Sequence, residues 1–456
     1  MGQRSAFVIA ATRSGSGKTL LSLGLLAALV RRGLAVQPFK CGPDFIDPTL
    51  HTMVVNRVSD NLDLFMMGAE CCRRIFARAA ATVDVCLVEG VMGLFDGGEA
   101  STAALARTLD LPVLLVVDAR SAAESVAAVV KGFEVYDPRI RLCGVVLNQI
   151  GSARHLELIR GALVSSCATP LLGAFPREQQ FTMPERHLGL HMGEENPLSA
   201  GQLDRLAAAV EKHIDIPALL AATGRPLPPP GPAPSPPLRP VQPRLRLAVA
   251  RDAAFCFYYQ ENLEMLAAAG FDIVPFSPLT DAALPPATAA VYIGGGYPEL
   301  QAAALTANQP MRTALRRWVE EGGLLYCECG GLMYMAEELA DTEGRVHPMV
   351  GIFPLKMIMR PRLSRLGYRR VRLRRDCFLG RRGDELYGHE FHYSEPAGEA
   401  PELDCLYALD DGRQEGYVRH NAVGSYVHLH FGRTAATVDH FFRHALSMQT
   451  RREGRA

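Results

Sequence analysis

The sequence lacks several patterns, and each absence argues against a class of protein. Its eleven cysteines form no C-x-x-C pair, which argues against a zinc ribbon and a dithiol redox motif. No apolar run is long enough to span a bilayer. The 48 basic residues balance 48 acidic ones, and a neutral protein coats nucleic acid poorly. Scattered cysteines suit a reducing compartment. We therefore expect a cytoplasmic protein that binds small molecules, with no nucleic acid, no membrane span and scope for a homodimer.

A proline-rich segment at residues 223–243 divides the chain. Proline cannot donate a backbone hydrogen bond, so this segment should be an extended linker outside any sheet. The length of 456 residues suits two or three domains. We therefore predict domains at 1–222 and 244–450, the linker between them, and a frayed tail at 451–456.

Both halves alternate short apolar runs with longer helical patterns, which is typical of parallel α/β folds. The strands expected in the first half are Ala6–Ala10, Ala35–Phe39, Val83–Glu89, Val113–Asp118 and Leu142–Asn148. Those expected in the second half are Leu245–Ala250, Asp272–Phe276, Ala290–Ile293 and Leu324–Cys327. The sequence thus predicts two α/β domains.

A glycine-containing loop follows the first expected strand and opens the first helix. Backbone N–H groups of such a loop cradle phosphates, while its lysine reaches the outer phosphates and its threonine binds magnesium. Thr12 stands where the usual first glycine of the loop would lie, so the loop is a variant. The sequence predicts ATP and Mg²⁺ here, bound by Ser14, Gly15, Ser16, Gly17, Lys18 and Thr19.

Polar residues follow later strands of the same sheet, where a parallel fold presents ligands. Glu89 ends the third expected strand and is the favoured second magnesium ligand beside Thr19. Asp44 and Asp47, after the second strand, are its rivals. Each could instead be a helix cap or turn residue. Asn148, at the end of the fifth strand, is a candidate for contacting the adenine or a simple turn former.

Cys329 lies between an expected strand and a helical run that continues to Leu339. A nucleophile at such a turn stands beside a helix N-terminus, which favours the thiolate. The alternative is a buried apolar cysteine. A cysteine nucleophile needs a base. The histidines available in this half include His389, His392, His420, His428 and His430.

Several long motifs, in the same order, resemble the cobyrinic acid and hydrogenobyrinic acid a,c-diamide synthase family. They are Ser14-Gly-Ser-Gly-Lys-Thr19, Gln37-Pro-Phe-Lys-Cys-Gly-Pro-Asp-Phe-Ile-Asp-Pro48, Glu89-Gly-Val-Met-Gly-Leu-Phe-Asp96, Glu185-Arg-His-Leu-Gly-Leu190, Cys327-Glu-Cys-Gly-Gly-Leu-Met-Tyr334, Gly388-His-Glu-Phe-His-Tyr-Ser394 and Ser425-Tyr-Val-His-Leu-His-Phe431. The first half is also similar to dethiobiotin synthetase, whose phosphate loop lacks the same glycine. The resemblance implies that Lys40 and Glu89 join Lys18 and Thr19 as nucleotide and magnesium ligands.

The family resemblance implies a phosphate-loop domain followed by a class I glutamine-amidotransferase-like domain. ATP would phosphorylate a carboxylate arm of a tetrapyrrole, and ammonia from glutamine would displace the phosphate. Cys329 and His428 align with the catalytic pair. Related triads place an acid two residues after the histidine, but His430 stands there, so we expect a dyad with His430 structural. The oxyanion hole is expected at Gly295, Gly296 and Gly330.

Three departures from the family pattern fall where a substrate could bind, among them Phe45 in place of a tyrosine and a changed stretch after Asp63. The resemblance implies tetrapyrrole contacts at Asp44, Phe45, Ile46, Asn61 and Asp63. Two alternatives remain at this point. One keeps the chemistry on sirohaem or another sirohydrochlorin-derived ring, and the other is a phosphate-loop switch that ligates nothing.

Ten arginines lie between Arg360 and Arg382. The run Arg370-Val-Arg-Leu-Arg-Arg375 alternates as a strand does, with one cationic face. It is either a solvated edge strand or a surface that meets a polycarboxylate substrate or the first domain.

Overall fold

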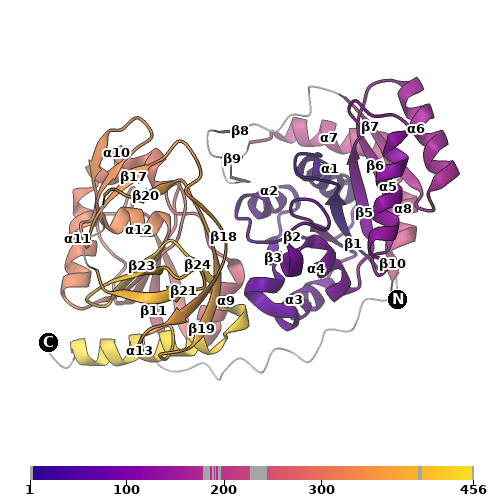
Figure 1. Cartoon of the computed structure of the whole chain (residues 1–456). Coiled ribbons are helices and arrows are strands. Elements are labelled where there is room, and N and C mark those ends of the chain that lie inside the picture. Colours follow the sequence, from indigo (N-terminus) through magenta and orange to yellow (C-terminus); the bar gives the residue numbers. More distant parts are fainter. Residues whose placement is uncertain are drawn as a thin grey trace. The chain divides into compact units, whose positions relative to one another are not determined.

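The computed structural model describes residues 4–177, 185–186, 189–190, 192–193, 197–225, 244–398 and 403–453. The chain divides into two compact units, Met1–Pro234 and Ser235–Ala456 (Figure 1). Thr223–Arg225, at the start of the expected linker, belong to a helix and a short strand of the first unit, and 226–243 lie outside the described residues. None of the described helices is long and apolar enough to cross a bilayer.

The first unit is built on a sheet with the strand order β3-β2-β4-β1-β5-β6-β7. These strands are parallel, and β10 pairs with β1 in the opposite direction. All strands expected in this half are present, whereas β3, β7 and β10 were not predicted. The strands are β1 (Arg4–Ala11), β2 (Val36–Cys41), β3 (Asp60–Leu62), β4 (Val85–Glu89), β5 (Val113–Asp118), β6 (Leu142–Ile150), β7 (Leu171–Pro176) and β10 (Gly224–Arg225), with β8 (Glu185–Arg186) and β9 (Gly189–Leu190) as a separate pair.

Helices cover both faces of this sheet because its strands are apolar on both sides. Leu114 and Val116 of β5 pack in a cluster with α1, α7 and α8, whereas Leu115 and Val117 pack with α5 and α6. The helices are α1 (Lys18–Arg31), α2 (Ile46–Val55), α3 (Leu64–Ala80), η1 (Gly98–Ala100), α4 (Thr102–Leu109), α5 (Ser125–Tyr136), α6 (Ala153–Ser166), α7 (Ala200–His213) and α8 (Ile216–Thr223). Parallel pairing brings the carboxyl ends of β1, β2, β4 and β6 to one edge, which is where the candidate nucleotide residues follow.

The second unit has a long mixed sheet in the order β12-β11-β13-β14-β23-β22-β21-β18-β19-β24. The strands from β12 to β23 in this order are parallel, as expected, and the remainder pair antiparallel. A smaller sheet has the order β16-β15-β17-β20. The strands are β11 (Leu245–Ala250), β12 (Phe271–Phe276), β13 (Thr288–Ile293), β14 (Leu324–Glu328), β15 (Ala336–Ala340), β16 (Val346–Pro348), β17 (Phe353–Met359), β18 (Arg365–Leu373), β19 (Glu385–His392), β20 (Ser394–Pro396), β21 (Cys405–Leu409), β22 (Gln414–Arg419), β23 (Ala422–Ser425) and β24 (His428–His430).

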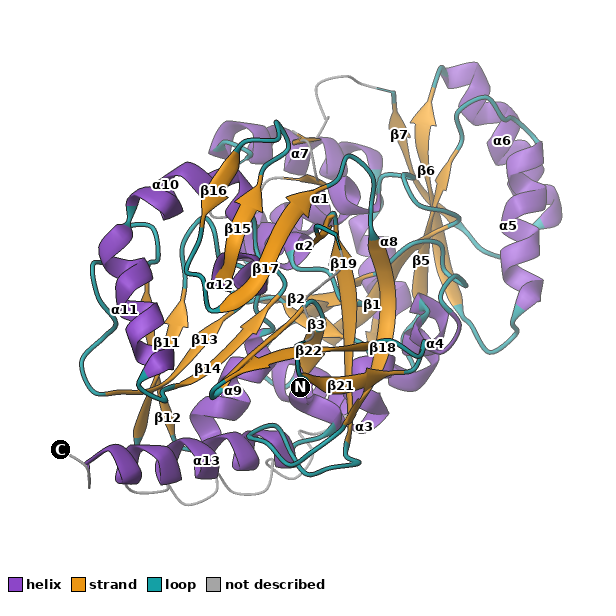
Figure 2. Cartoon of the chain, turned by 60° about the vertical axis from the view of Figure 1, so that its left-hand side comes forward, coloured by secondary structure: helices purple, strands orange, loops and turns teal. Residues whose placement is uncertain are grey.

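Helices pack on the parallel half of the mixed sheet, and Figure 2 shows α13 running along the end of the unit beside α9. The helices are α9 (Gln260–Ala269), η4 (Pro298–Gln301), α10 (Ala302–Ala307), α11 (Gln309–Glu320), α12 (Gly330–Met335), η5 (Phe431–Arg433) and α13 (Ala436–Glu453). The first residues of the expected frayed tail, 451–453, continue α13.

The helix after Cys329 is shorter than predicted. It ends at Met335, and Ala336–Ala340 form strand β15 between β16 and β17. The segment Ala-Glu-Glu-Leu-Ala favours a helix by composition, but pairing with two strands outweighs that local preference.

The arginine-rich run forms the strand predicted for it. In β18, Val371 and Leu373 are buried while Arg370 and Arg372 are exposed, so the alternation is as expected. The edge-strand alternative is wrong, because β18 pairs with β19 on one side and β21 on the other. Two of its arginines meet carboxylates, Arg369 with Glu390 at 2.6 Å and Arg372 with Glu385 at 3.2 Å.

Candidate functional site

The loop after β1 is held in a shape that two glycines make possible. Gly15 and Gly17 have φ of 74° and 92°, a region that favours glycine. A Cβ on Gly17 would lie 2.3 Å from Nδ2 of Asn148, and that amide donates to the carbonyl of Ser16 at 3.0 Å. Asn148 from β6 therefore supports the loop directly. Asn148, Gly17 and Phe175 also line a small pocket beside α1.

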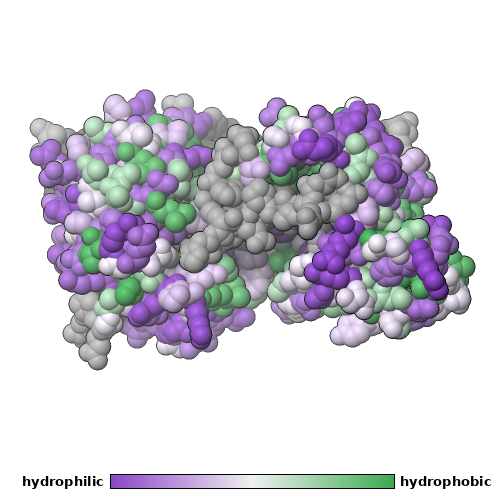
Figure 3. All heavy atoms as spheres, turned by 90° about the horizontal axis from the view of Figure 1, so that it is seen from above, coloured by the Kyte–Doolittle hydropathy of each residue, from purple (hydrophilic) through white to green (hydrophobic). Residues whose placement is uncertain are grey.

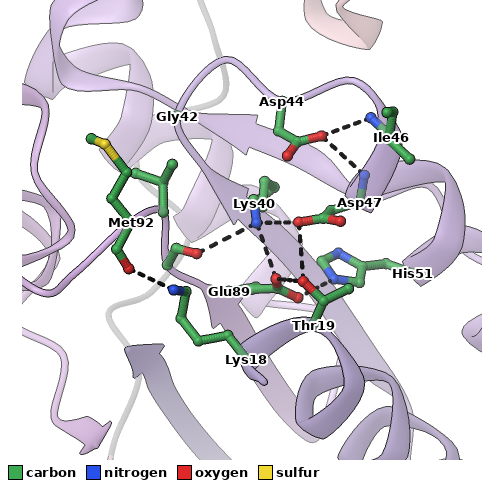
Figure 4. A network of polar contacts seen from close by, with 12 residues as sticks. Lys18, Thr19, Lys40, Gly42, Asp44, Ile46, Asp47, His51, Glu89 and Met92 are labelled. Carbon is green, nitrogen blue, oxygen red and sulfur yellow. Dashed lines mark hydrogen bonds and ion pairs between the residues drawn. The ribbon is translucent and has the colours of Figure 1, made fainter. Parts of the chain in front are cut away.

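Charged side chains from α1, α2, β2 and β4 converge below the loop (Figure 4). The Thr19 hydroxyl donates to Oε1 of Glu89 at 2.8 Å and lies 3.5 Å from Oδ2 of Asp47. Lys40 donates to both carboxylates, and its Nζ is 3.0 Å from Glu89. Lys18 points to the carbonyl of Met92. Thr19, Lys40, Asp47 and Glu89, which the sequence predicted from separate segments, thus lie together.

Lys40 and Glu89 sustain each other's charge despite deep burial, whereas burial and the charge of Asp44 raise the pKa of Asp47 well above its ordinary value. Burial favours neutral lysine, but Asp47 and Glu89 outweigh it and raise the pKa of Lys40 well above its ordinary value. Burial likewise opposes ionisation of Glu89, yet Lys40 and His51 hold its pKa well below the usual range. For Lys18, burial and the charge of Lys40 lower the pKa. Glu89 is therefore a carboxylate at neutral pH.

The oxygens of this cluster suit a hard divalent cation. Mg²⁺ prefers hydroxyl and carboxylate oxygen ligands. Thr19, Asp47 and Glu89 present such oxygens within hydrogen-bonding range of one another. Across the described ranges, no group of three or more histidine, cysteine, aspartate or glutamate side chains is arranged as a ready metal cage. A magnesium ion here would therefore depend on the hydroxyl and on further ligands from a nucleotide.

The residues expected to meet a tetrapyrrole shape the loop between β2 and α2. Asp44 accepts from the backbone N–H groups of Ile46 and Asp47, at 2.7 and 3.0 Å, and its charge raises the pKa of both Lys40 and Asp47. Asn61 donates to the carbonyls of Gly42 and Asp44. Asp63 caps α3 through the N–H of Met66. Phe45 and Ile46 are half-buried at the start of α2.

Cys329 occupies a strained turn between β14 and α12. Its φ and ψ are 49° and −104°, which a residue other than glycine rarely adopts, and its N–H donates to the carbonyl of Ser425 at 2.7 Å. Burial raises the pKa of the Cys329 thiol to about 12, and Glu299 adds to the rise. The expectation of a thiolate favoured by the helix is thus wrong for this state, because burial outweighs a helix of six residues. The thiol needs a base.

His428, on β24, is a buried neutral imidazole. Burial lowers its pKa well below the ordinary value, and His389 and His392 lower it further. Its ring stacks on His389 with centroids 5.0 Å apart. Its Nδ1 lies 3.8 Å from Oε2 of Glu328, the residue that precedes the cysteine. A neutral ring can accept a proton, which is what a base must do.

Gly295 brings the cysteine and the histidine to one place. A Cβ built on it would lie 2.5 Å from Cε1 of His428 and 3.4 Å from Cβ of Cys329, so both side chains flank this glycine. A Cβ on Gly330 would lie 3.1 Å from the backbone nitrogen of Gly296, which places those two residues side by side. The glycines predicted for the oxyanion hole are therefore adjacent to the nucleophile.

Comparisons with known proteins find family models that match each half of the chain. A family model for the CobQ/CobB/MinD/ParA nucleotide binding domain matches residues 7–190, and one for the CobB/CobQ-like glutamine amidotransferase domain matches residues 246–436. The chain is 42% identical to cobyrinate a,c-diamide synthase of Dehalococcoides mccartyi, over 96% of this chain and 97% of that one. This chain belongs to the cobyrinate a,c-diamide synthase family. The enzymes of that name from Salmonella typhimurium and Synechocystis are each 40% identical to it, over 96% and 97% of this chain and 97% and 94% of theirs. The family predicted from the motifs is confirmed.

In this member of the cobyrinate a,c-diamide synthase family, two residues that contact the candidate sites were not predicted from the sequence. His51 of α2 is fully buried and lies 2.9 Å from Glu89 through Nε2, with Nδ1 3.1 Å from Ser59. The signal was a histidine four residues after Asp47 on the same helix. The second residue that was not predicted is Glu328. Its position directly before Cys329 was the only indication of a role in the sequence.

The remaining histidines of this family member have other contacts. His430 accepts from the N–H of Gly432 through Nδ1, and His392 bonds to the carbonyl of Ser394 through Nδ1. His389 meets the Tyr259 hydroxyl at 3.0 Å. His420 lies in the turn between β22 and β23 with a φ of 53°. Of the five, His428 is the one that flanks Gly295.

Gly295→Ala is expected to lower glutamine hydrolysis by about 100-fold, since a displacement of the reacting groups by about 1 Å costs that much. The added methyl group would lie 2.5 Å from the His428 ring and must push it away from Cys329. Steady-state glutaminase rates measure the effect. Gly161→Ala, on α6 where a Cβ meets open space, is the control and should change nothing. A fully active Gly295→Ala would mean that His428 is not held against this glycine.

Proposed function

We propose that this chain amidates the a and c side-chain carboxylates of cobyrinic acid, using ATP and glutamine. The observation that carries the proposal is the match over nearly the whole chain to enzymes named cobyrinate a,c-diamide synthase. It is supported by a Cys–His pair in the second unit and a phosphate loop with a Thr19–Glu89–Lys40 cluster in the first. A ligase of this class needs one site to release ammonia and another to activate a carboxylate.

Ammonia is released in the second unit. His428 takes the thiol proton of Cys329 on Nε2, and the thiolate attacks the amide carbon of glutamine. The N–H groups of Gly296 and Gly330 stabilise the negative oxygen that forms. The proton on His428 passes to the departing nitrogen, which leaves as ammonia. Water then hydrolyses the thioester, and glutamate is released.

The carboxylate is activated in the first unit. The N–H groups of Ser14–Thr19 and the ammonium group of Lys18 hold the ATP phosphates in place. Thr19 and Glu89, with Asp47 beside them, would hold Mg²⁺, which offsets negative charge on the phosphates. A propionate or acetate oxygen attacks the γ-phosphorus and ADP leaves. Ammonia then adds to the acyl phosphate carbon and phosphate departs, which leaves the amide.

The ring contacts are placed at the loop between β2 and α2. The carboxylate of Asp44 accepts from backbone N–H groups and Asn61 donates to two carbonyls, so these two residues fix the loop, while Asp63 caps α3. The half-buried side chains of Phe45 and Ile46 are therefore the ones that we propose to pack against a flat ring. Asn148 is proposed to bind next to the adenine, since it adjoins Gly17.

The decisive experiment offers the purified protein ATP, magnesium and glutamine together with one ring at a time. Cobyrinic acid, hydrogenobyrinic acid and sirohaem are tested in parallel, and products are identified by mass spectrometry. We expect two added amides on cobyrinic acid and none on sirohaem. Amidation of sirohaem alone would contradict the proposed acceptor and keep the chemistry. Omission of ATP is the control, and no amide should form without it.

A further inference from the structure

Glu328, the residue before the nucleophile, is a buried carboxylate surrounded by donors. It lies at the end of β14 and is 2% exposed. Its Oε1 accepts from the Tyr326 hydroxyl at 2.6 Å, and its Oε2 accepts from the Tyr292 hydroxyl at 2.8 Å. Tyr292 lies on the neighbouring strand β13. Two hydroxyls therefore hold this side chain in one orientation, and a buried acid so held has a fixed direction.

The same carboxylate reaches the strand that carries His428. Oε1 also accepts from the backbone N–H of Leu429, at 3.0 Å, and Leu429 directly follows His428. Oε2 lies 3.8 Å from Nδ1 of the His428 ring. Glu328 thus fixes the backbone next to the histidine and faces Nδ1 of its ring, whereas Cε1 and Nε2 of that ring lie nearest a Cβ built on Gly295.

A histidine that accepts a proton on Nε2 must carry its own hydrogen on Nδ1. A carboxylate near Nδ1 favours that tautomer and stabilises the imidazolium that forms. In catalytic sites without substrate such contacts are often longer than a hydrogen bond, and they tighten in the complex. A carboxylate at 3.8 Å is therefore correctly placed for this role.

Two other buried carboxylates of the second unit are engaged elsewhere. Glu390 accepts from Arg369 and Arg413, and Glu415 accepts from the Ser425 hydroxyl and the Tyr426 N–H. The position two residues after the base holds His430.

We propose that Glu328 is the positioning residue for His428, a role that usually falls to an acid further along the chain. This inference rests on the proposed glutaminase function of the same site. In this fold one turn of the chain supplies both the nucleophile and the group that orients its base. The Cys329–His428 pair is thereby extended to a triad whose acid comes from β14.

The test is Glu328→Gln in the full-length protein. The amide keeps the size of the side chain but can donate to Nδ1, which favours the tautomer that cannot act as the base. We expect the glutaminase kcat to fall by at least about 10-fold. The upper limit is the roughly 10⁴-fold loss of kcat that results when a triad histidine is held in the wrong tautomer. The KM for glutamine and the ammonia-dependent amidation should stay as in the wild type. Burial raises the pKa of Glu328 to about 7, so assays belong at about pH 8, where the carboxylate prevails.

Glu337→Gln is the matched control, because it makes the same change on an exposed side chain of β15. It should retain most of the glutaminase kcat. If Glu328→Gln does not fold, Glu328→Asp, which withdraws the carboxylate by one methylene, should lower kcat at constant KM. A variant with unchanged kcat, or one that loses kcat and ammonia-dependent amidation together, would overturn the role of Glu328 alone. A wild-type protein without glutaminase activity would overturn both this role and the proposed function.

Discussion

Cys329→Ser is expected to abolish glutamine-dependent amidation and leave ammonia-dependent amidation at the wild-type rate. The serine hydroxyl is a far weaker nucleophile than a thiolate, and loss of a nucleophile costs glutaminase activity about 10⁴-fold or more. Serine tolerates the same backbone as cysteine, so the strained turn at φ 49° should persist. The measurement compares amide yield with glutamine and with ammonium chloride as nitrogen sources.

The control for this variant is Cys405→Ser, the same change in the same unit on a half-buried thiol of β21. It should leave both nitrogen sources usable. Glutamine-dependent amidation that survives in Cys329→Ser would refute the assignment of the nucleophile. Loss of both activities would instead place Cys329 in the folding of the unit.

Lys18→Met is expected to have the converse effect, with amidation lost from either nitrogen source and basal glutamine hydrolysis retained. Lys18 is the first residue of α1, and its ammonium group donates to the carbonyl of Met92 (Figure 4). Removing one charge that stabilises a transferring phosphoryl group costs about 100-fold or more. The reaction is followed by ADP release and by amide formation, and glutamate release is measured in parallel.

Lys131→Met provides the matched control. Lys131 is half-exposed on α5 and pairs with Glu134 three residues later, an interaction that contributes little. Its replacement should affect neither rate. Normal ADP release by Lys18→Met would show that the phosphates lie elsewhere, and the nucleotide site would then have to be sought away from this loop.

The parallel core of each unit was predictable because its strands are short, continuous apolar runs with glycine or polar residues after them. β1, β5 and β14 are examples. Lys18 opens the helix that follows β1, Asp118 is the last residue of β5, and Cys329 directly follows β14. The antiparallel half of the second unit was not predictable in this way. Its strands are half-polar, and β15 has a helix-forming composition that pairing with β16 and β17 overrides.

The site residues divide along a similar line. The phosphate loop and the strand–turn–helix at Cys329 depend on local sequence, so both could be recognised there, and the family resemblance then singled out Cys329 as the nucleophile. Glu328 and His51 act through contacts with residues 100 and 38 positions away, at His428 and Glu89. No local pattern reports such a contact. The thiol of Cys329 was also misjudged, since its burial depends on tertiary packing.

The strained backbone of Cys329 has a consequence for the history of such a chain. At its φ and ψ, a residue with a Cβ is less favourable than glycine by about 1–3 kcal/mol. Selection for thermal stability and selection for glutamine hydrolysis therefore favour different amino acids at one codon. In a lineage supplied with free ammonia, replacement of this cysteine by glycine would stabilise the fold without removing an activity that the lineage needs. The strain at Cys329 is therefore a stability cost that comes with placing a nucleophile at this turn.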